Sequence, residues 1–181
     1  MMKKLLIIVC FLAFYCCKKK SANNNYQYLS FSKNVLDYRV TPQNKYDKKG
    51  LMFSDQGAWF AYSYPDSLNI TGFTGPFLMT QQNGVWASQS LNELSIKNIQ
   101  WTHHSSHSYS SHLEQSFQSQ NVELIQKLVF LSGHTAIIQS IIKNKSDQKL
   151  SLEYTLKNKP ILADSLQLEY SKNELTITSS K

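Results

Sequence analysis

The side chains of this sequence that could recognise a ligand gather in one segment, residues 50–86. This segment holds five of the six glycines and two of the three tryptophans, so tight turns there can present aromatic rings at fixed places. Aromatic rings can stack on the apolar face of a pyranose, while nearby carboxylate or amide groups hold its hydroxyls. The candidate ligand-binding residues are Asp55, Gln56, Trp59, Tyr62 and Trp86. Two alternatives stay open, because the rings can equally fill a core and Asp55 can cap its own turn.

The acidic residues do not form an evident catalytic set. Glycoside hydrolysis normally needs two carboxyl groups that flank the scissile bond, one as an acid and one as a base or nucleophile. Of the twelve acidic residues, only Asp55 and Asp66 lie in the aromatic segment, and most of the others sit in turns or on the outer faces of strands, where solvation explains them. The turn role is favoured for Asp55, and we expect no catalytic residue in this chain. No Gly-x-Ser-x-Gly elbow and no nucleotide-binding glycine pattern occurs, and we therefore also expect no cofactor.

Four of the five histidines fall in a serine-rich run at residues 102–112. On a helix, His103 and His107 would share one face, which is a common arrangement of metal ligands. Serine-rich sequence forms helices poorly, however, and the run contains no carboxylate. The sequence therefore predicts a solvated loop here, without a metal site.

The N-terminal residues have the pattern of an export signal. Two lysines precede an apolar run at residues 5–15, which is too short for a transmembrane helix of about 20 residues. Cys16 and Cys17 follow where cleavage is expected, in an arrangement that resembles the lipobox of bacterial lipoproteins. Cys17 is favoured as the lipidated residue because a smaller side chain precedes it than precedes Cys16. The alternative is an ordinary cleaved signal peptide with incidental cysteines.

This pattern divides the chain into three parts. We expect a lipoprotein signal peptide with its anchor cysteine at residues 1–17, a flexible polar tether at 18–28 and a folded domain at 29–181. The protein would be exported to the cell envelope and held by lipid in the outer membrane or in the periplasm-facing membrane. All three cysteines precede residue 18, so the folded domain has no disulfide and no thiolate zinc site.

The charge of the chain does not indicate a nucleic-acid partner. The formal net charge is +7, and it falls to about +5 when the two leader lysines are removed. The basic residues are scattered lysines, and Arg39 is the only arginine. Nucleic-acid grooves favour clustered charge and arginine, so solvated lysines on a β surface explain this composition better.

The remainder of the chain has the pattern of short β-strands. Residues 149–156 alternate between polar side chains and the apolar Leu150, Leu152, Tyr154 and Leu156, as a half-buried antiparallel strand does. The dipeptide Asn83-Gly84 is a strong hairpin signal. Roughly ten such strands without a convincing helical period predict an all-β fold, an antiparallel β-sandwich of the supersandwich type.

Three ordered strings within the aromatic segment carry a resemblance to a known family: GLMFSDQGAWF at residues 50–60, GFTGPF at 72–77 and QQNGVW at 81–86. They resemble the N-terminal β-sandwich domain of bacterial glycoside hydrolase family 63-like proteins, which include trehalase-like and α-glucosidase-like enzymes. In such proteins the sandwich precedes a barrel of helical hairpins that carries the catalytic carboxylates. Nothing in residues 1–181 resembles that barrel, so the sandwich is expected to be cut short at its C-terminal end.

The resemblance implies a non-catalytic sandwich that packs on a helical catalytic domain and helps to shape its site. The ligand of the whole enzyme would be an α-glucoside or a related oligosaccharide. The alternative is a stand-alone surface lipoprotein that binds carbohydrate or a protein partner and catalyses nothing.

Overall fold

The computed structural model describes residues 34, 36–55, 57–79, 81 and 83–162, together with the backbone of two further strands at 166–171 and 174–179. The predicted leader, the lipidation candidates Cys16 and Cys17, the tether and Gln56 lie outside the described residues. The described part is built of β-strands and contains no helix that is long and apolar enough to cross a bilayer.

The strands follow one another with short connections, except for the longer segments before β1, between β1 and β2, and before β9. Their bounds are β1 (Phe60–Ser63), β2 (Thr74–Met79), β3 (Gly84–Trp86), β4 (Ser88–Ile96), β5 (Thr102–Ser108), β6 (His112–Gln118), β7 (Val122–Ser132), β8 (Thr135–Asn144), β9 (Tyr154–Pro160), β10 (Leu166–Ser171) and β11 (Glu174–Ser179).

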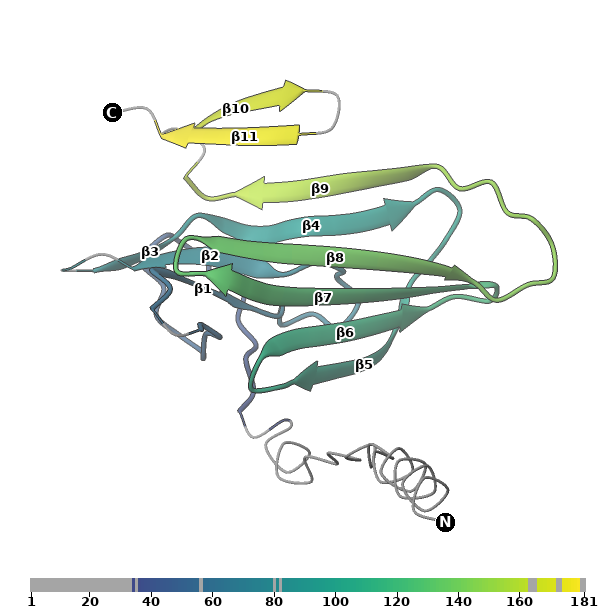
Figure 1. Cartoon of the computed structure of the whole chain (residues 1–181), viewed down its shortest axis with the longest axis horizontal. Helices are drawn as coiled ribbons and strands as arrows, with labels where there is room; N and C mark the ends of the chain where they lie inside the picture. The colour runs from purple at the N-terminus through teal and green to yellow at the C-terminus, as the bar shows by residue number, and fades with distance from the viewer. Residues whose placement is uncertain are drawn as a thin grey trace, which may run out of the picture. The chain divides into compact units, whose positions relative to one another are not determined.

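All paired strands are antiparallel, which confirms the predicted fold class. Strands β5 to β8 form a four-stranded meander in sequence order, as Figure 1 shows. The other sheets are β1-β2-β3, the pair β4-β9 and the hairpin β10-β11. A bridge between Phe73 and Leu91 joins the segment before β2 to β4. The β1-β2-β3 sheet and the β4-β9 pair therefore adjoin each other, and we call them the two smaller sheets.

The four-stranded sheet and the two smaller sheets face each other across a common core. Near β1, one buried cluster combines residues of both layers: Phe53, Tyr62, Tyr64, Phe73, Leu113, Leu128 and Phe130. Near β4, a second cluster does the same with Leu94, Ile96, Phe117 and Leu124. Two layers of sheet with their apolar faces in contact are a β-sandwich, as the alternating sequence predicted.

A pair of buried glutamines joins the two layers at the centre of this core. The side-chain oxygen of Gln126 accepts the backbone N–H of Gly72 at 2.6 Å, and Gln115 donates to the Gly72 carbonyl. The amide nitrogen of Gln126 donates to Asn92 O at 3.2 Å and to Ser140 Oγ at 3.1 Å. Gly72 has φ +91°, and a Cβ there would lie 2.4 Å from Leu91 O, so this close approach requires glycine. Hence both buried glutamines are satisfied, whereas the buried Thr74 Oγ1 has no hydrogen-bond partner among the described residues.

The apolar face of β9 differs from the sequence expectation. Tyr154 is 62% exposed and Leu156 is 49% exposed, although their cross-strand partners on β4, Ile96 and Leu94, are buried. Partners directly opposite in an antiparallel pair share a face of the sheet. The alternation therefore identified the correct face, but the opposing sheet covers that face at β4 and not at these positions of β9.

Candidate functional site

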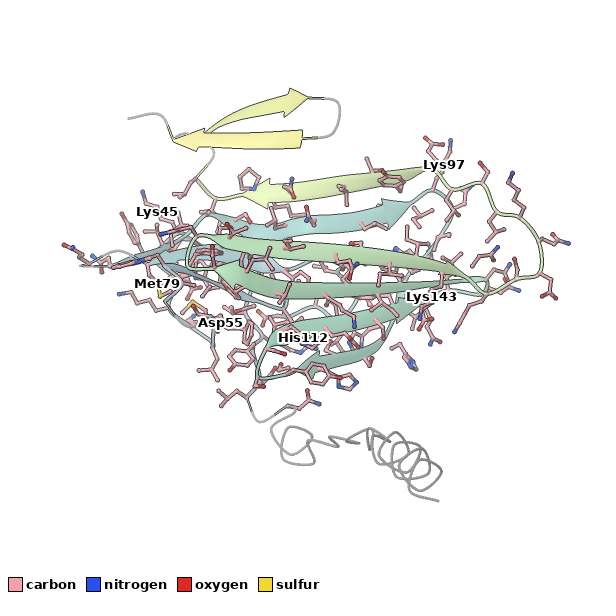
Figure 2. The ribbon with its side chains drawn as sticks, viewed as in Figure 1. Lys45, Asp55, Met79, Lys97, His112 and Lys143 are labelled. Atoms are coloured by element: carbon pink, nitrogen blue, oxygen red, sulfur yellow. The ribbon has the colours of Figure 1, made fainter. Side chains whose placement is uncertain are left out.

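Three chain segments meet at one end of the sandwich and form a junction around Trp59. The Trp59 N–H donates to Gly133 O at 3.3 Å, which ties the segment before β1 to the turn between β7 and β8. The Met79 N–H donates to Trp59 O at 2.8 Å and adds the end of β2. In Figure 2, Asp55 and Met79 lie toward the same end of the sandwich, away from Lys97 and Lys143. We call the exposed side chains of Asp55, Trp59 and Leu131 at this junction the Trp59 surface.

Trp59 is the predicted ligand residue whose ring remains available at this end. Its side chain is 56% exposed, and Leu131, just before the β7–β8 turn, is 61% exposed. Asp55 lies in the turn that precedes Trp59, where its carbonyl accepts the Ala58 N–H at 3.1 Å and Gly57 has φ +75°. An exposed indole beside a carboxylate can stack on a sugar ring and accept its hydroxyl hydrogens. Gln56, the third predicted residue of this turn, lies outside the described residues.

The structure places the other two predicted residues in the core and on opposite faces of the β1-β2-β3 sheet. Tyr62 is 7% exposed and packs with Phe60 and Phe130 between the two layers. Trp86 is fully buried, with its ring centroid 5.0 Å from that of Phe77. The structure therefore does not bring the five predicted residues together, and a ligand role for the group depends on Asp55 and Trp59.

The burial of Tyr62 predicts a loss of stability in alkali. Burial raises its pKa to about 12, and it also raises the pKa of the neighbouring Tyr64. The folded state thus favours the neutral phenol, whereas an unfolded tyrosine ionises near pH 10. The contribution to the free energy of unfolding is complete below pH 10 and is lost as the pH rises toward 12. We expect the urea midpoint to fall over that range, and to fall less steeply in Tyr62→Phe.

Absorbance at 295 nm provides the check on this prediction, because it reports tyrosinate directly. Tyr62 and Tyr64, whose pKa burial raises, should ionise only as the protein unfolds. Ionisation of all ten tyrosines near pH 10 without unfolding would contradict the predicted burial.

The histidine run is a strand and not the solvated loop that the sequence predicted. Residues 102–108 form β5, which pairs with β6 along its length. Serine and histidine are accepted here because their polar atoms find cross-strand partners: Ser105 Oγ lies 2.7 Å from Ser116 Oγ, and the His103 ring packs edge-on against Phe117. Among the described residues, no three histidine, cysteine or acidic side chains are grouped so that they could hold a metal ion.

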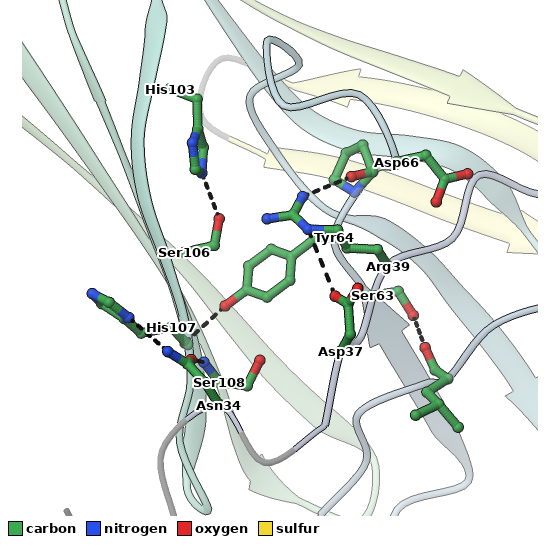
Figure 3. A network of polar contacts seen from close by, with 12 residues as sticks. Asn34, Asp37, Arg39, Ser63, Tyr64, Asp66, His103, Ser106, His107 and Ser108 are labelled. Atoms are coloured by element: carbon green, nitrogen blue, oxygen red, sulfur yellow. Dashed lines mark hydrogen bonds and ion pairs between the residues drawn. The ribbon is translucent and has the colours of Figure 1, made fainter.

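A second polar site lies beside β5, where the sequence offered no signal. Figure 3 shows Arg39, Tyr64 and Ser106 converging there from distant parts of the chain. The Tyr64 hydroxyl donates to the carbonyl oxygens of His107 at 2.8 Å and Glu114 at 3.0 Å, which fixes the ring against β5 and β6. A parallel bridge between Arg39 and Tyr64 brings the arginine to the same place.

Comparison with known proteins gives one finding about the family. The family model described as the N-terminal domain of glucosidase YgjK matches residues 32–178, most of the chain. A search of curated proteins found no match. The family match confirms the expected similarity to an N-terminal glucosidase domain.

Proposed function

Because the chain belongs to the family of the N-terminal domain of glucosidase YgjK, we propose that it is the non-catalytic β-sandwich part of an exported glycoside hydrolase. The enzyme acts on α-glucosides or related oligosaccharides, and the sandwich packs on an (α/α) catalytic barrel and helps to shape its site. The observation that carries the proposal is the extent of the match, since residues 32–178 reach into every described strand.

The carboxyl groups of the described residues support a non-catalytic role. Asp66 is engaged in the fold, because its Oδ2 accepts the Thr41 N–H at 2.8 Å and its own N–H donates to Thr41 Oγ1 at 3.1 Å.

Burial alone would raise the pKa of Glu114, but the Lys127 ammonium 2.7 Å away outweighs burial and lowers it. Backbone N–H groups of Gln43 and Lys49 lower the pKa of Asp47. A glycosidase general acid needs the opposite shift, a raised pKa.

The Trp59 surface is the part of the sandwich that we propose contributes to the enzyme's site. Exposed tryptophan and leucine side chains are costly to leave in water, and tryptophan is enriched where proteins meet partners or ligands. Asp55 adds an acceptor that can orient a sugar hydroxyl. The catalytic acid and base then come from the barrel, since Asp47, Asp66 and Glu114 are engaged within the sandwich.

The test is an assay of the chain with and without a catalytic barrel. Residues 21–181 alone are expected to hydrolyse neither trehalose nor aryl α-glucosides, whereas the same residues joined to the barrel encoded with them should turn over one of these substrates. Trp59→Ala in the joined protein should reduce that turnover while leaving the sandwich folded. Hydrolysis by residues 21–181 alone that is abolished by Asp55→Asn or Asp66→Asn would overturn the proposal.

Export and lipid anchoring complete the proposal, and they are motivated by the basic and apolar leader with its cysteine pair. Labelled fatty acid should enter the full-length protein in a bacterial host. Changing both Cys16 and Cys17 to serine should release the protein from the membrane fraction, and Cys10→Ser should leave it there as the matched control. Retention of the double variant in the membrane would show that another feature holds the protein there.

A further inference from the structure

A small polar cleft lies beside β5, on a different set of residues from the Trp59 surface. Its volume is about 220 Å³, and its lining combines side chains from three parts of the chain: Asn34, Leu36, Asp37, Arg39, Tyr64, Ser106 and Ser108. Drug-sized ligands occupy pockets of about 300–1,000 Å³, so this cleft suits a smaller molecule, of the size of one sugar unit. We call it the Arg39 cleft.

The arginine of the cleft uses two of its three nitrogens in contacts with described residues. Its Nη1 donates to Pro65 O at 3.1 Å, and its Nε lies 3.6 Å from Asp37 Oδ1. Nη2 makes no hydrogen bond to any of the described residues. The side chain is only 21% exposed, with the guanidinium carbon 5.3 Å from the centre of the Tyr64 ring. A partly desolvated guanidinium with free donors is a strong partner for a planar carboxylate, which it can bind through two parallel hydrogen bonds.

The other polar groups of the cleft are hydroxyls and the Asn34 amide, together with the exposed carboxylate of Asp37. Ser106 and Ser108 both line it, and Ser106 Oγ lies 2.7 Å from His103 Nε2. Burial lowers the pKa of His103, and the charge of Arg39 lowers it further, so the neutral form of this imidazole is favoured. Among the described residues that line the cleft, Arg39 is the single cation, which favours a monoanion over a phosphate dianion, and the serine hydroxyls favour a hydroxylated ligand.

We propose that the Arg39 cleft binds a small hydroxylated carboxylate of the hexuronate class, with the carboxylate on Arg39 and the hydroxyls on Ser106 and Ser108. This inference does not depend on the proposed glycosidase role, which concerns neutral glucosides and the Trp59 surface. Asp37 is the natural competitor for the guanidinium. Its side chain is 79% exposed and its pairing distance is long, so the ligand displaces it at little cost.

The test is a calorimetric titration of the folded full chain with D-glucuronate, D-glucose and acetate. We expect saturable binding of D-glucuronate. D-glucose and acetate should each bind more weakly by about tenfold or more, since D-glucose lacks the carboxylate and acetate lacks the hydroxyls. Equal binding of acetate would overturn the role of the hydroxyls. Equal binding of D-glucose, or no binding of D-glucuronate, would overturn the carboxylate site.

Two variants that should change the affinity for D-glucuronate in opposite directions distinguish an effect on binding from an effect on folding. Arg39→Gln should weaken the binding of D-glucuronate about tenfold or more, because it removes the guanidinium that binds the carboxylate. Asp37→Asn should tighten it by about twofold to fivefold, because it removes the competing carboxylate and keeps the shape of the side chain. Lys45→Gln, which removes a cation that lies over Tyr46, is the matched control and should bind as the unaltered protein does. Unchanged or weaker binding by a folded Asp37→Asn protein would contradict the proposal, even if Arg39→Gln fails to fold.

Discussion

Replacing Trp86 with alanine is expected to lower the free energy of unfolding by about 3–5 kcal/mol, whereas Trp59→Ala should change it by less than about 0.5 kcal/mol. The Trp86 side chain is fully buried, and its Nε1–H donates to Asp47 O at 2.6 Å. Its removal leaves a cavity beside Phe77 and an unpaired carbonyl. The Trp59 ring is 56% exposed and leaves no comparable cavity.

Urea denaturation followed by circular dichroism measures both changes under the same conditions. A domain of ordinary stability has about 5–15 kcal/mol, so the Trp86 variant should lose a large part of it. Because the two substitutions are chemically identical, they differ only in where the ring lies. A large loss for Trp59→Ala with a small loss for Trp86→Ala would reverse the assignment of these rings to surface and core.

Replacing Gln126 with alanine should cost about 2–4 kcal/mol, because one side chain satisfies several buried groups at once. The substitution leaves the buried Gly72 N–H and the partly buried Asn92 carbonyl without their partners. Gln139→Ala is the matched control, because Gln139 is exposed on β8 and should be neutral within about 0.5 kcal/mol. The same urea experiment measures both variants. Equal midpoints would show that the Gln126 hydrogen bonds add little to the stability of the fold.

The fold class could be predicted because a strand reveals its faces through its nearest neighbours in sequence. The alternation of apolar and polar residues cannot show whether another sheet covers the apolar face. For this reason Leu156 was expected in the core, although it is half exposed. It also failed for β5, where serine and histidine obey no hydrophobic alternation. Their pairing there depends on polar partners in β6, such as Ser116, that only the folded chain brings into reach.

The candidate sites show the same limit. Asp55 and Trp59 could be singled out from sequence because they belong to one turn-rich segment. The assignment of Tyr62 and Trp86 to the same group could not be checked that way, since composition does not distinguish a ring that stacks on a ligand from one that fills a core. Nor could sequence indicate the Arg39 cleft, whose residues come from three segments that are joined by the parallel bridge at Tyr64 and by hydrogen bonds to β5.

The pairing of β4 with β9 also sets the order in which the sandwich can assemble. Strands β5 to β8 all lie between these partners in the sequence, so Ile96 meets Tyr154 only by closing a loop that contains the whole meander. The meander needs only short hairpin closures, whereas the entropy cost of the long closure is repaid only after the meander provides a surface for docking. We therefore expect the meander to act as the folding nucleus. The β4–β9 ladder would form late and be among the first to open in the native state.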